Sequence, residues 1–171
     1  MAEPVKIDLH PAGGAEVRVE LLPERLERLD PEAGPGADPW RLAGPLDPGE
    51  VESLRFLAGR LGDGRALAVA ALRPAGAPGH GDEFVIGLLG PPDALERLAE
   101  VLLSTEYGPD GLPRRVGLEL YETEGAVPLR VAGTVTEATA QGEEGVRVRA
   151  GLELRHGGER GAGIYELRAA R

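Results

Sequence analysis

The strongest constraint on this chain is a series of short runs toward its C-terminus in which apolar and polar residues alternate. Alternation with a period of two is typical of strands with one buried face. The runs are joined by glycine-containing turns of a few residues, and connections of that length join antiparallel neighbours. The sequence therefore predicts four consecutive antiparallel strands over residues 112–169, within a C-terminal meander that spans residues 105–169.

Shorter strand signals precede this region. Residues 5–10 and 15–22 alternate around a tetrapeptide of proline, alanine and glycine, which indicates a hairpin. The apolar runs at 65–73 and 83–89 have strand length and indicate buried strands. Residues 31–49 are so rich in proline and glycine that we expect a long loop there.

Two segments indicate helices. Asp47 supplies an N-cap and Pro48 a proline at the first helical position, and apolar residues follow at helical spacing, which predicts a helix over residues 48–61 with one face on the sheet. Those apolar residues are Val51, Leu54, Ala58 and Leu61. Residues 93–103 begin with a capping pair but alternate from Val101 onward, which favours a short helix passing into a strand.

These signals define an expected architecture. With 171 residues and 42% hydrophobic content, the chain is long enough to bury a core, and residues 1–171 are expected to form a single domain. The predicted fold class is β-rich (α+β). We expect an antiparallel sheet that forms a barrel-like or sandwich domain, with one to three short helices packed on it.

Composition excludes several functions. The chain has no cysteine and three histidines without a recurrent ligand spacing, so neither a metal nor a cofactor is expected. The net charge is −10, and no basic stripe appears, which argues against nucleic-acid binding. No apolar run is long enough to span a membrane, and the first ten residues lack the order of a secretory signal, so we expect a cytoplasmic protein.

Two residues are weak candidates for catalysis. His80 lies in a Gly-His-Gly tripeptide before two carboxylates that could orient it as a general base, although the tip of a hairpin is the alternative. Glu166 depends on which face of its strand is buried. If the Tyr165 face packs, Glu166 is solvated, and this is the favoured arrangement. If the Ile164 face lines a barrel, Glu166 is a buried carboxylate with a raised pKa and a candidate acid.

Aromatic residues are the candidate ligand-binding groups. They form only 4% of the chain, and aromatics this scarce usually fill a core. If a pocket exists, tyrosine hydroxyls and an indole edge would orient a mainly apolar ligand. We expect a pocket bounded by the C-terminal sheet, with the single tryptophan folded over its mouth from the long loop. The candidates are Trp40, Tyr107, Tyr121 and Tyr165.

Residues 105–169 also carry a family resemblance. The segments YGPDGLPRR (107–115), EG (124–125), VAGTV (131–135) and GAGIYE (161–166) resemble the last strands of lipocalin-like families that include carotenoid 1,2-hydratase and tocopherol cyclase. The matching motifs are mainly turn signals. Members of those families are usually longer and have two barrel-like halves, so this chain corresponds to about one half. No catalytic residue can be matched to a position here.

Two classes of function follow. The resemblance implies a lipocalin-like protein that binds an apolar small molecule such as a terpenoid or steroid, with isomerase, hydratase or cyclase activity as an extension of that role. The alternative is a non-catalytic β-rich module for protein interaction or dimerisation, in which a sheet edge or apolar face contacts a partner or a second copy. A ligand that co-purifies would favour the first class, and a concentration-dependent homodimer without a cavity the second.

Overall fold

The computed structural model describes residues 3–11, 16–29, 38–76, 83–142 and 145–170. Its strands form two sheets, one small and one large. The small sheet comprises β1 (Val5–Leu9), β2 (Val17–Leu21) and β3 (Trp40–Leu42), in that order. In the described part of the chain the helix is α1 (Pro23–Glu27), which follows β2 directly. No described helix has the length and apolar character needed to cross a membrane.

Within the described residues, the large sheet is antiparallel and has nine strands. Its strands are β4 (Val51–Arg60), β5 (Ala66–Pro74), β6 (Phe84–Gly90), β7 (Glu96–Arg97), β8 (Glu100–Tyr107), β9 (Pro113–Tyr121), β10 (Leu129–Gln141), β11 (Gly145–His156) and β12 (Glu159–Ala170). Their spatial order is β7-β6-β5-β4-β12-β11-β10-β9-β8. The four strands expected over residues 112–169 are β9 to β12, and each pairs with the next. The buried strands expected near 65–73 and 83–89 are β5 and β6.

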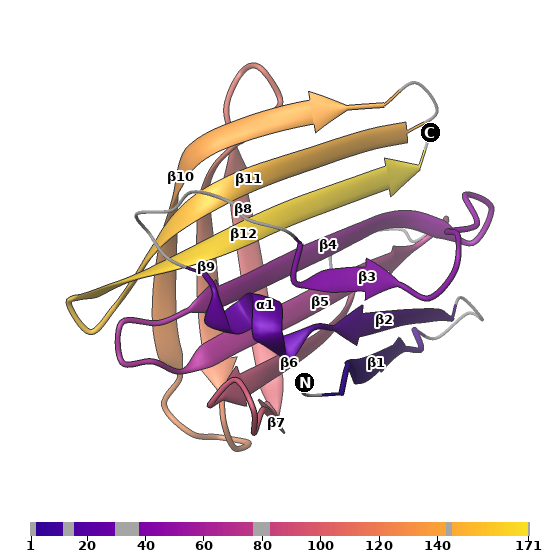
Figure 1. Cartoon of the computed structure of the whole chain (residues 1–171). Coiled ribbons are helices and arrows are strands. Elements are labelled where there is room, and N and C mark those ends of the chain that lie inside the picture. The colour runs from indigo at the N-terminus through magenta and orange to yellow at the C-terminus, as the bar shows by residue number, and fades with distance from the viewer. Residues whose placement is uncertain (1–2, 12–15, 30–37, 77–82, 143–144, 171) are drawn as a thin grey trace.

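The large sheet curls into a half-barrel (Figure 1). β7 and β8 follow each other in the chain but lie at opposite edges of the sheet, since β7 pairs with β6 and β8 pairs with β9. The two edges therefore meet at the junction between β7 and β8. Between them, Leu98 N–H donates to Gly87 O at 2.8 Å, and Ala99 N–H donates to Tyr121 O at 2.8 Å. From Glu100 onward the described pairing of β8 is with β9, so the edges separate and the half-barrel is open at the far end of β8.

A glycine-lined recess lets the strands curl tightly around one leucine. Gly133 and Gly163 come from different strands, and a Cβ on either would lie within about 3.3 Å of the Leu154 methyl groups. A Cβ on Gly59 would overlap the same side chain. Larger residues at these glycine positions would push the strands apart. The glycines instead leave space that the Leu154 side chain fills on the inner face.

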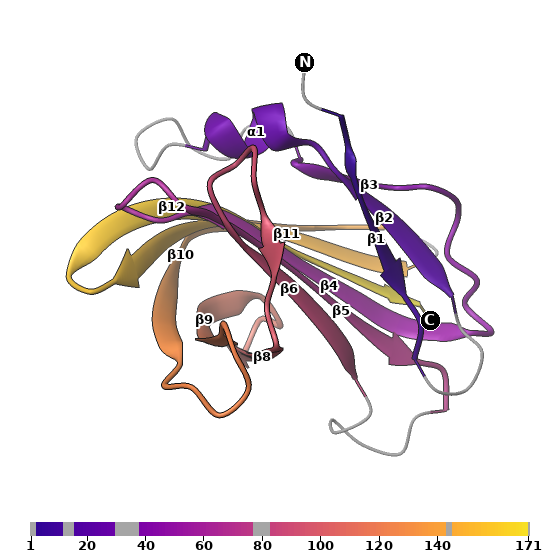
Figure 2. The same cartoon turned by 90° about the horizontal axis from the view of Figure 1, so that it is seen from below.

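Both faces of the central strands are buried. Figure 2 shows the small sheet and α1 on one side of the large sheet and the curled β8 and β9 on the other. One apolar cluster fills the interior of the curl, and a second fills the space between the two sheets. In this article the inner face is the side toward the interior of the curl, and the outer face is the side toward β1, β2 and β3.

The predicted helix over residues 48–61 is wrong. Asp47 does cap the backbone, since Gly49 N–H donates to Asp47 Oδ1 at 2.8 Å and Val51 N–H donates to Asp47 O at 2.9 Å. The turn then opens into β4, which pairs with β5 on one side and β12 on the other. Pairing along both edges and burial of both faces outweigh the weak helical propensity of a one-turn signal.

Two further expectations differ from the structure. The short helix expected within residues 93–103 is replaced by β7 and β8, because this segment pairs with β6 and then with β9. The expected loop over residues 31–49 contains β3, which adds to the small sheet by pairing with β2. Residues 31–37 of that loop lie outside the described residues.

Candidate functional site

The inner face of the half-barrel changes character toward its open end. Near the closed end, alternate positions of β4 and β12 carry residues that pack into the interior cluster, such as Leu57 and Tyr165. Two residues before Leu57 on the same face of β4 lies Arg55, and Glu83 directly precedes β6. Thr105 comes from β8. The strand alternation therefore brings polar side chains from four strands or strand ends to one place.

These side chains form a continuous hydrogen-bonded chain. Arg55 and Glu83 make a double salt bridge, in which Arg55 Nε donates to Glu83 Oε2 at 2.9 Å and the second bond joins Nη2 to Oε1. Arg55 Nη1 also donates to Thr105 Oγ1 at 3.1 Å, and Thr105 Oγ1 donates to the Tyr165 hydroxyl at 3.3 Å. The Tyr165 and Tyr107 hydroxyl oxygens lie 3.0 Å apart. We call these five residues the mouth cluster.

Arg55 also closes the seam between β6 and β8. Its Nη2 atom lies 3.3 Å from the carbonyl oxygen of Leu103 in β8, while its salt bridge holds Glu83 at the start of β6. Among the described residues, backbone pairing joins the two edges at the other end of the seam, near Leu98. The guanidinium therefore connects β6 and β8 by hydrogen bonds in the part of the seam where the described backbones of these two strands are not paired.

Burial sets the ionisation of the mouth cluster. Tyr165 is fully buried, and burial together with the adjacent Tyr107 raises its pKa well above the usual range, so the phenol is neutral at physiological pH. Burial lowers the pKa of Arg55, but hydrogen bonds to Glu83 outweigh this and the net pKa is raised. The cluster thus combines a compensated ion pair with neutral hydroxyls, which can donate to or accept from an oxygen-containing ligand group.

Two hollows adjoin the mouth cluster. The first has a volume of about 610 Å³, and Leu103, Leu167 and Ala169 form its apolar lining. Its polar lining comprises Glu52, Ser53, Arg55, Arg73, Glu83, Ser104, Thr105 and Tyr107. The second, of about 980 Å³, follows β8 and extends over β9 and β10 to the β11–β12 turn. Both hollows include Glu83, Leu103 and Ser104, so they meet along β8. We call them the mouth hollow and the β8 groove.

The structure brings together two of the four predicted ligand-binding aromatics. Tyr107 is 43% exposed at the mouth and contacts the buried Tyr165. Tyr121 lies away from them, with its hydroxyl donating to Glu119 at 3.3 Å. The tryptophan does not cover the mouth. Trp40 is buried on the outer face, where its ring stacks on Phe56 with a centroid distance of 5.1 Å.

Glu166 is buried, whereas the favoured expectation was a solvated side chain. Its exposed fraction is 0%, because the small sheet covers the outer face while the neighbouring Tyr165 packs inside the curl. Trp40 Nε1 donates to Glu166 Oε2 at 2.7 Å. Arg147 Nε and Arg168 Nε both donate to Oε1, the latter at 3.2 Å. Three donors hold this carboxylate, which lies on the outer face and not in the interior of the curl.

The remaining sequence candidate, His80, lies outside the described residues. In the described ranges there is no group of three or more histidine, aspartate or glutamate side chains placed to hold a metal ion. Sequence reasoning missed Arg55, Glu83 and Thr105. A signal for Arg55 was present, because it is a charged residue in a run that otherwise becomes apolar, but the predicted helix considered only the apolar residues of this run.

The fold and the mouth cluster define a class of structure: a curled antiparallel half-barrel with a polar group at its open end. No protein-family model matches the chain, and no curated protein matches it. Among solved structures, the chain is similar to a crystal structure from Nitrosomonas europaea provisionally described as AttH, with a TM-score of 0.49 and 14% identity. The match covers 98% of this chain and 65% of that one, and the likeness concerns shape alone.

Proposed function

We propose that this protein binds an elongated, mainly apolar small molecule with one oxygen-containing end, of the terpenoid or steroid type. The mouth cluster carries the proposal, because it is a set of oriented hydroxyl and guanidinium groups at the open end of an otherwise apolar interior. Ligand sites are usually concave and apolar, with a few polar groups that fix orientation. The two hollows have volumes of about 610 Å³ and 980 Å³, within the range of such sites.

The polar end of the ligand would lie against Tyr107. Its hydroxyl faces the mouth hollow and is supported from behind by Tyr165, whose buried phenol stays neutral. The Arg55 guanidinium is already compensated by Glu83, so an alcohol or carbonyl suits this site better than a fully charged group. The apolar body would extend along β8, beside Leu103 and the other aliphatic residues of the groove.

The proposal agrees with the resemblance of residues 105–169 to lipocalin-like hydratases and cyclases, whose ligands are apolar. It stops at binding. A tyrosine with a raised pKa is a poor proton donor, and the single carboxylate of the mouth cluster is paired with a guanidinium. We therefore propose a carrier or sensor role for the site rather than an isomerase, hydratase or cyclase.

Removing the Tyr107 hydroxyl tests the proposal. Farnesol is a suitable probe because it is an apolar chain with one terminal hydroxyl, and isothermal titration calorimetry measures its affinity. We expect Tyr107→Phe to weaken binding about fivefold, since one neutral hydrogen bond contributes roughly 1 kcal/mol. Tyr121→Phe is the matched control, because that phenol contacts Glu119 outside the mouth and should leave the affinity unchanged.

Filling the mouth hollow gives a second, larger effect. Ala169 lines the hollow beside Leu167, and Ala169→Phe places a ring in that space. We expect at least a tenfold loss of farnesol affinity, with Trp40 emission unchanged by farnesol in any variant, because Trp40 lies on the opposite face. Absence of farnesol or sterol binding, together with a concentration-dependent dimer in analytical ultracentrifugation, would reject the proposal and favour the interaction-module alternative.

A further inference from the structure

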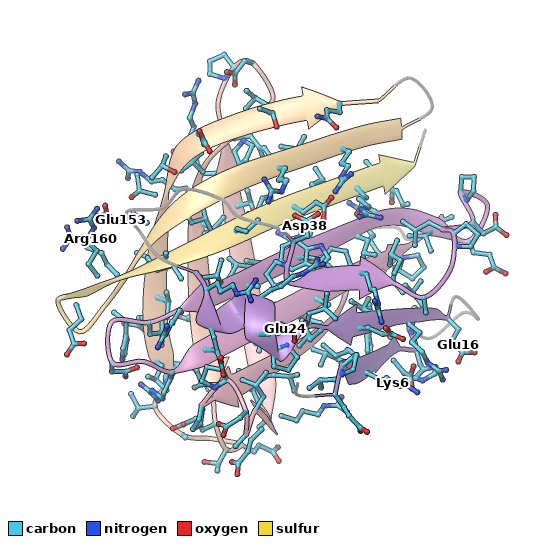
Figure 3. All side chains as sticks on the ribbon, viewed as in Figure 1. Lys6, Glu16, Glu24, Asp38, Glu153 and Arg160 are labelled. Carbon is cyan, nitrogen blue, oxygen red and sulfur yellow. The ribbon has the colours of Figure 1, made fainter. Side chains whose placement is uncertain are left out.

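A second group of charged side chains lies on the outer face, away from the mouth cluster. Asp38 precedes β3, and its carboxylate bridges two arginines of β11. Arg147 Nη2 donates to Asp38 Oδ2 at 3.0 Å, and Arg149 Nε donates to Asp38 Oδ1 at 2.7 Å. Figure 3 labels Asp38 in front of the large sheet, between β3 and the strands β11 and β12. One oxyanion thus already lies between two guanidinium groups.

Strand geometry explains why the arginines converge. Arg147 and Arg149 are two positions apart in β11, so both point to the outer face. In antiparallel register, Arg147 is opposite Gln141 of β10, and Arg149 is opposite Thr139. The four side chains therefore form a two-by-two array on neighbouring strands. Its groups are guanidinium, hydroxyl and amide, all of which can donate hydrogen bonds.

A hollow of about 320 Å³ adjoins this array. It is lined by Asp38, Thr139, Gln141, Arg147 and Arg149. The Arg147 side chain is 42% exposed and that of Arg149 is 27% exposed, whereas the Asp38 side chain is 22% exposed. The two arginines are therefore accessible from the hollow together with the exposed Thr139 and Gln141, although the chain as a whole has a net charge of −10.

We propose that this hollow binds a small oxyanion, of the phosphate or carboxylate class, between the two arginines and the β10 side chains. Arginine forks match the geometry of such anions and bind them through paired, charge-assisted hydrogen bonds. Thr139 and Gln141 supply further donors from the opposite strand. Asp38 occupies one side of the arginine pair and limits its affinity by repelling the anion.

Trp40 reports on this site. Its Nε1 atom donates to Glu166, and Glu166 in turn accepts from Arg147, so a shift of the Arg147 guanidinium changes the hydrogen bonding of the indole. Trp40 is the single tryptophan of the chain. Its emission therefore follows anion binding on the outer face without interference from the mouth hollow.

Inorganic phosphate is the probe for the test. The chain is titrated with phosphate at constant ionic strength, with potassium chloride as the matched salt, and Trp40 emission and calorimetric heat are recorded. We expect a saturating response to phosphate and none to chloride. Screening acts on all exposed charges and is the same for both salts at equal ionic strength, whereas binding at a site saturates. An equal response to the two salts would therefore overturn the proposal.

Variants on the two sides of the hollow give opposite expectations. Arg149→Gln should weaken phosphate binding about tenfold, because it removes a charge-assisted hydrogen bond. Asp38→Asn should strengthen binding roughly threefold, because it removes a competing negative charge. Arg114→Gln is the matched control, since Arg114 is an exposed arginine paired with Asp110 elsewhere, and it should leave binding unchanged.

A further variant covers the case in which Arg149→Gln fails to fold. Thr139→Val is nearly isosteric and removes one donor of the hollow, so it should weaken phosphate binding a few-fold. Retained wild-type affinity in both Arg149→Gln and Thr139→Val, or weaker binding in Asp38→Asn, would overturn the site. Farnesol binding at the mouth is independent of these results, because the hollow on the outer face and the mouth hollow share no lining residue.

Discussion

Replacing Glu166 by glutamine is expected to lower the free energy of unfolding by about 3 kcal/mol, because the three donors around this buried position lose their ionised acceptor. The carboxylate is fully buried and accepts from Trp40, Arg147 and Arg168. Glutamine keeps the size but removes the charge and turns one acceptor into a donor facing donors. We expect the melting temperature to fall by about 10 °C.

Thermal and urea unfolding followed by circular dichroism measure this effect, and Trp40 emission should shift because its hydrogen-bond acceptor changes. Glu153→Gln is the matched control. Glu153 also accepts from two arginines, Arg155 and Arg160, but it lies near the turn at the exposed end of β11 and β12 (Figure 3). Exposed pairs contribute about 1 kcal/mol or less. Equal losses in both variants would refute the structural role of the buried carboxylate.

Gly161→Ala is expected to destabilise the protein by about 2 kcal/mol, through overpacking rather than backbone strain. A Cβ at Gly161 would overlap the carbonyl oxygen of Arg60 and would lie 3.0 Å from the Cα of Leu61. Both are backbone atoms of the neighbouring strand end, so no side-chain rotation relieves the clash. β12 and β4 would have to move apart at this end of their pairing.

Gly44→Ala is the control for this substitution, because a Cβ there meets no atom within 4 Å. It should change the melting temperature little, whereas Gly161→Ala should lower it by about 5 °C. Differential scanning calorimetry compares the two variants with the parent protein. A melting temperature for Gly161→Ala within 1 °C of that of Gly44→Ala would contradict the close approach of β12 to β4.

The C-terminal strands could be predicted because their determinants are local. β9 and β11 alternate apolar and polar residues, and the turns that join the strands from β9 to β12 contain glycines with positive φ, such as Gly125 and Gly157. A period of two and a glycine that permits a left-handed turn need no distant partner to be recognised. These features set the strand boundaries and the antiparallel neighbours, though not the curl of the sheet.

The central strand β4 could not be predicted, because its determinants are distant. Asp47 makes the hydrogen bonds of a helix cap, and the residues after it fit a helical face as well as a strand. The choice is made by β5 and β12, which pair with both edges of β4, and β12 lies about a hundred residues along the chain. Burial of both faces then removes the polar alternation that marks a half-exposed strand.

The same reason governs the candidate site. Tyr107 and Tyr165 were two of the four aromatic residues named as candidates for ligand binding, and the structure joins their hydroxyls. The sequence could not place Trp40 on the opposite face. Tyr165 and Glu166 are neighbours in β12 and face different cores, and the sequence does not say which of these cores Trp40 joins.

By itself the sequence determined the β-rich class and the antiparallel C-terminal strands, because alternation and turn chemistry are local properties. Only the tertiary structure decided that the sheet curls, that the small sheet covers its outer face, and that Arg55, Glu83 and Thr105 meet at the open end. It also decided that Glu166 is buried. Each of these depends on which distant strands pair and which face they cover, and that follows from packing the whole chain rather than from any one segment.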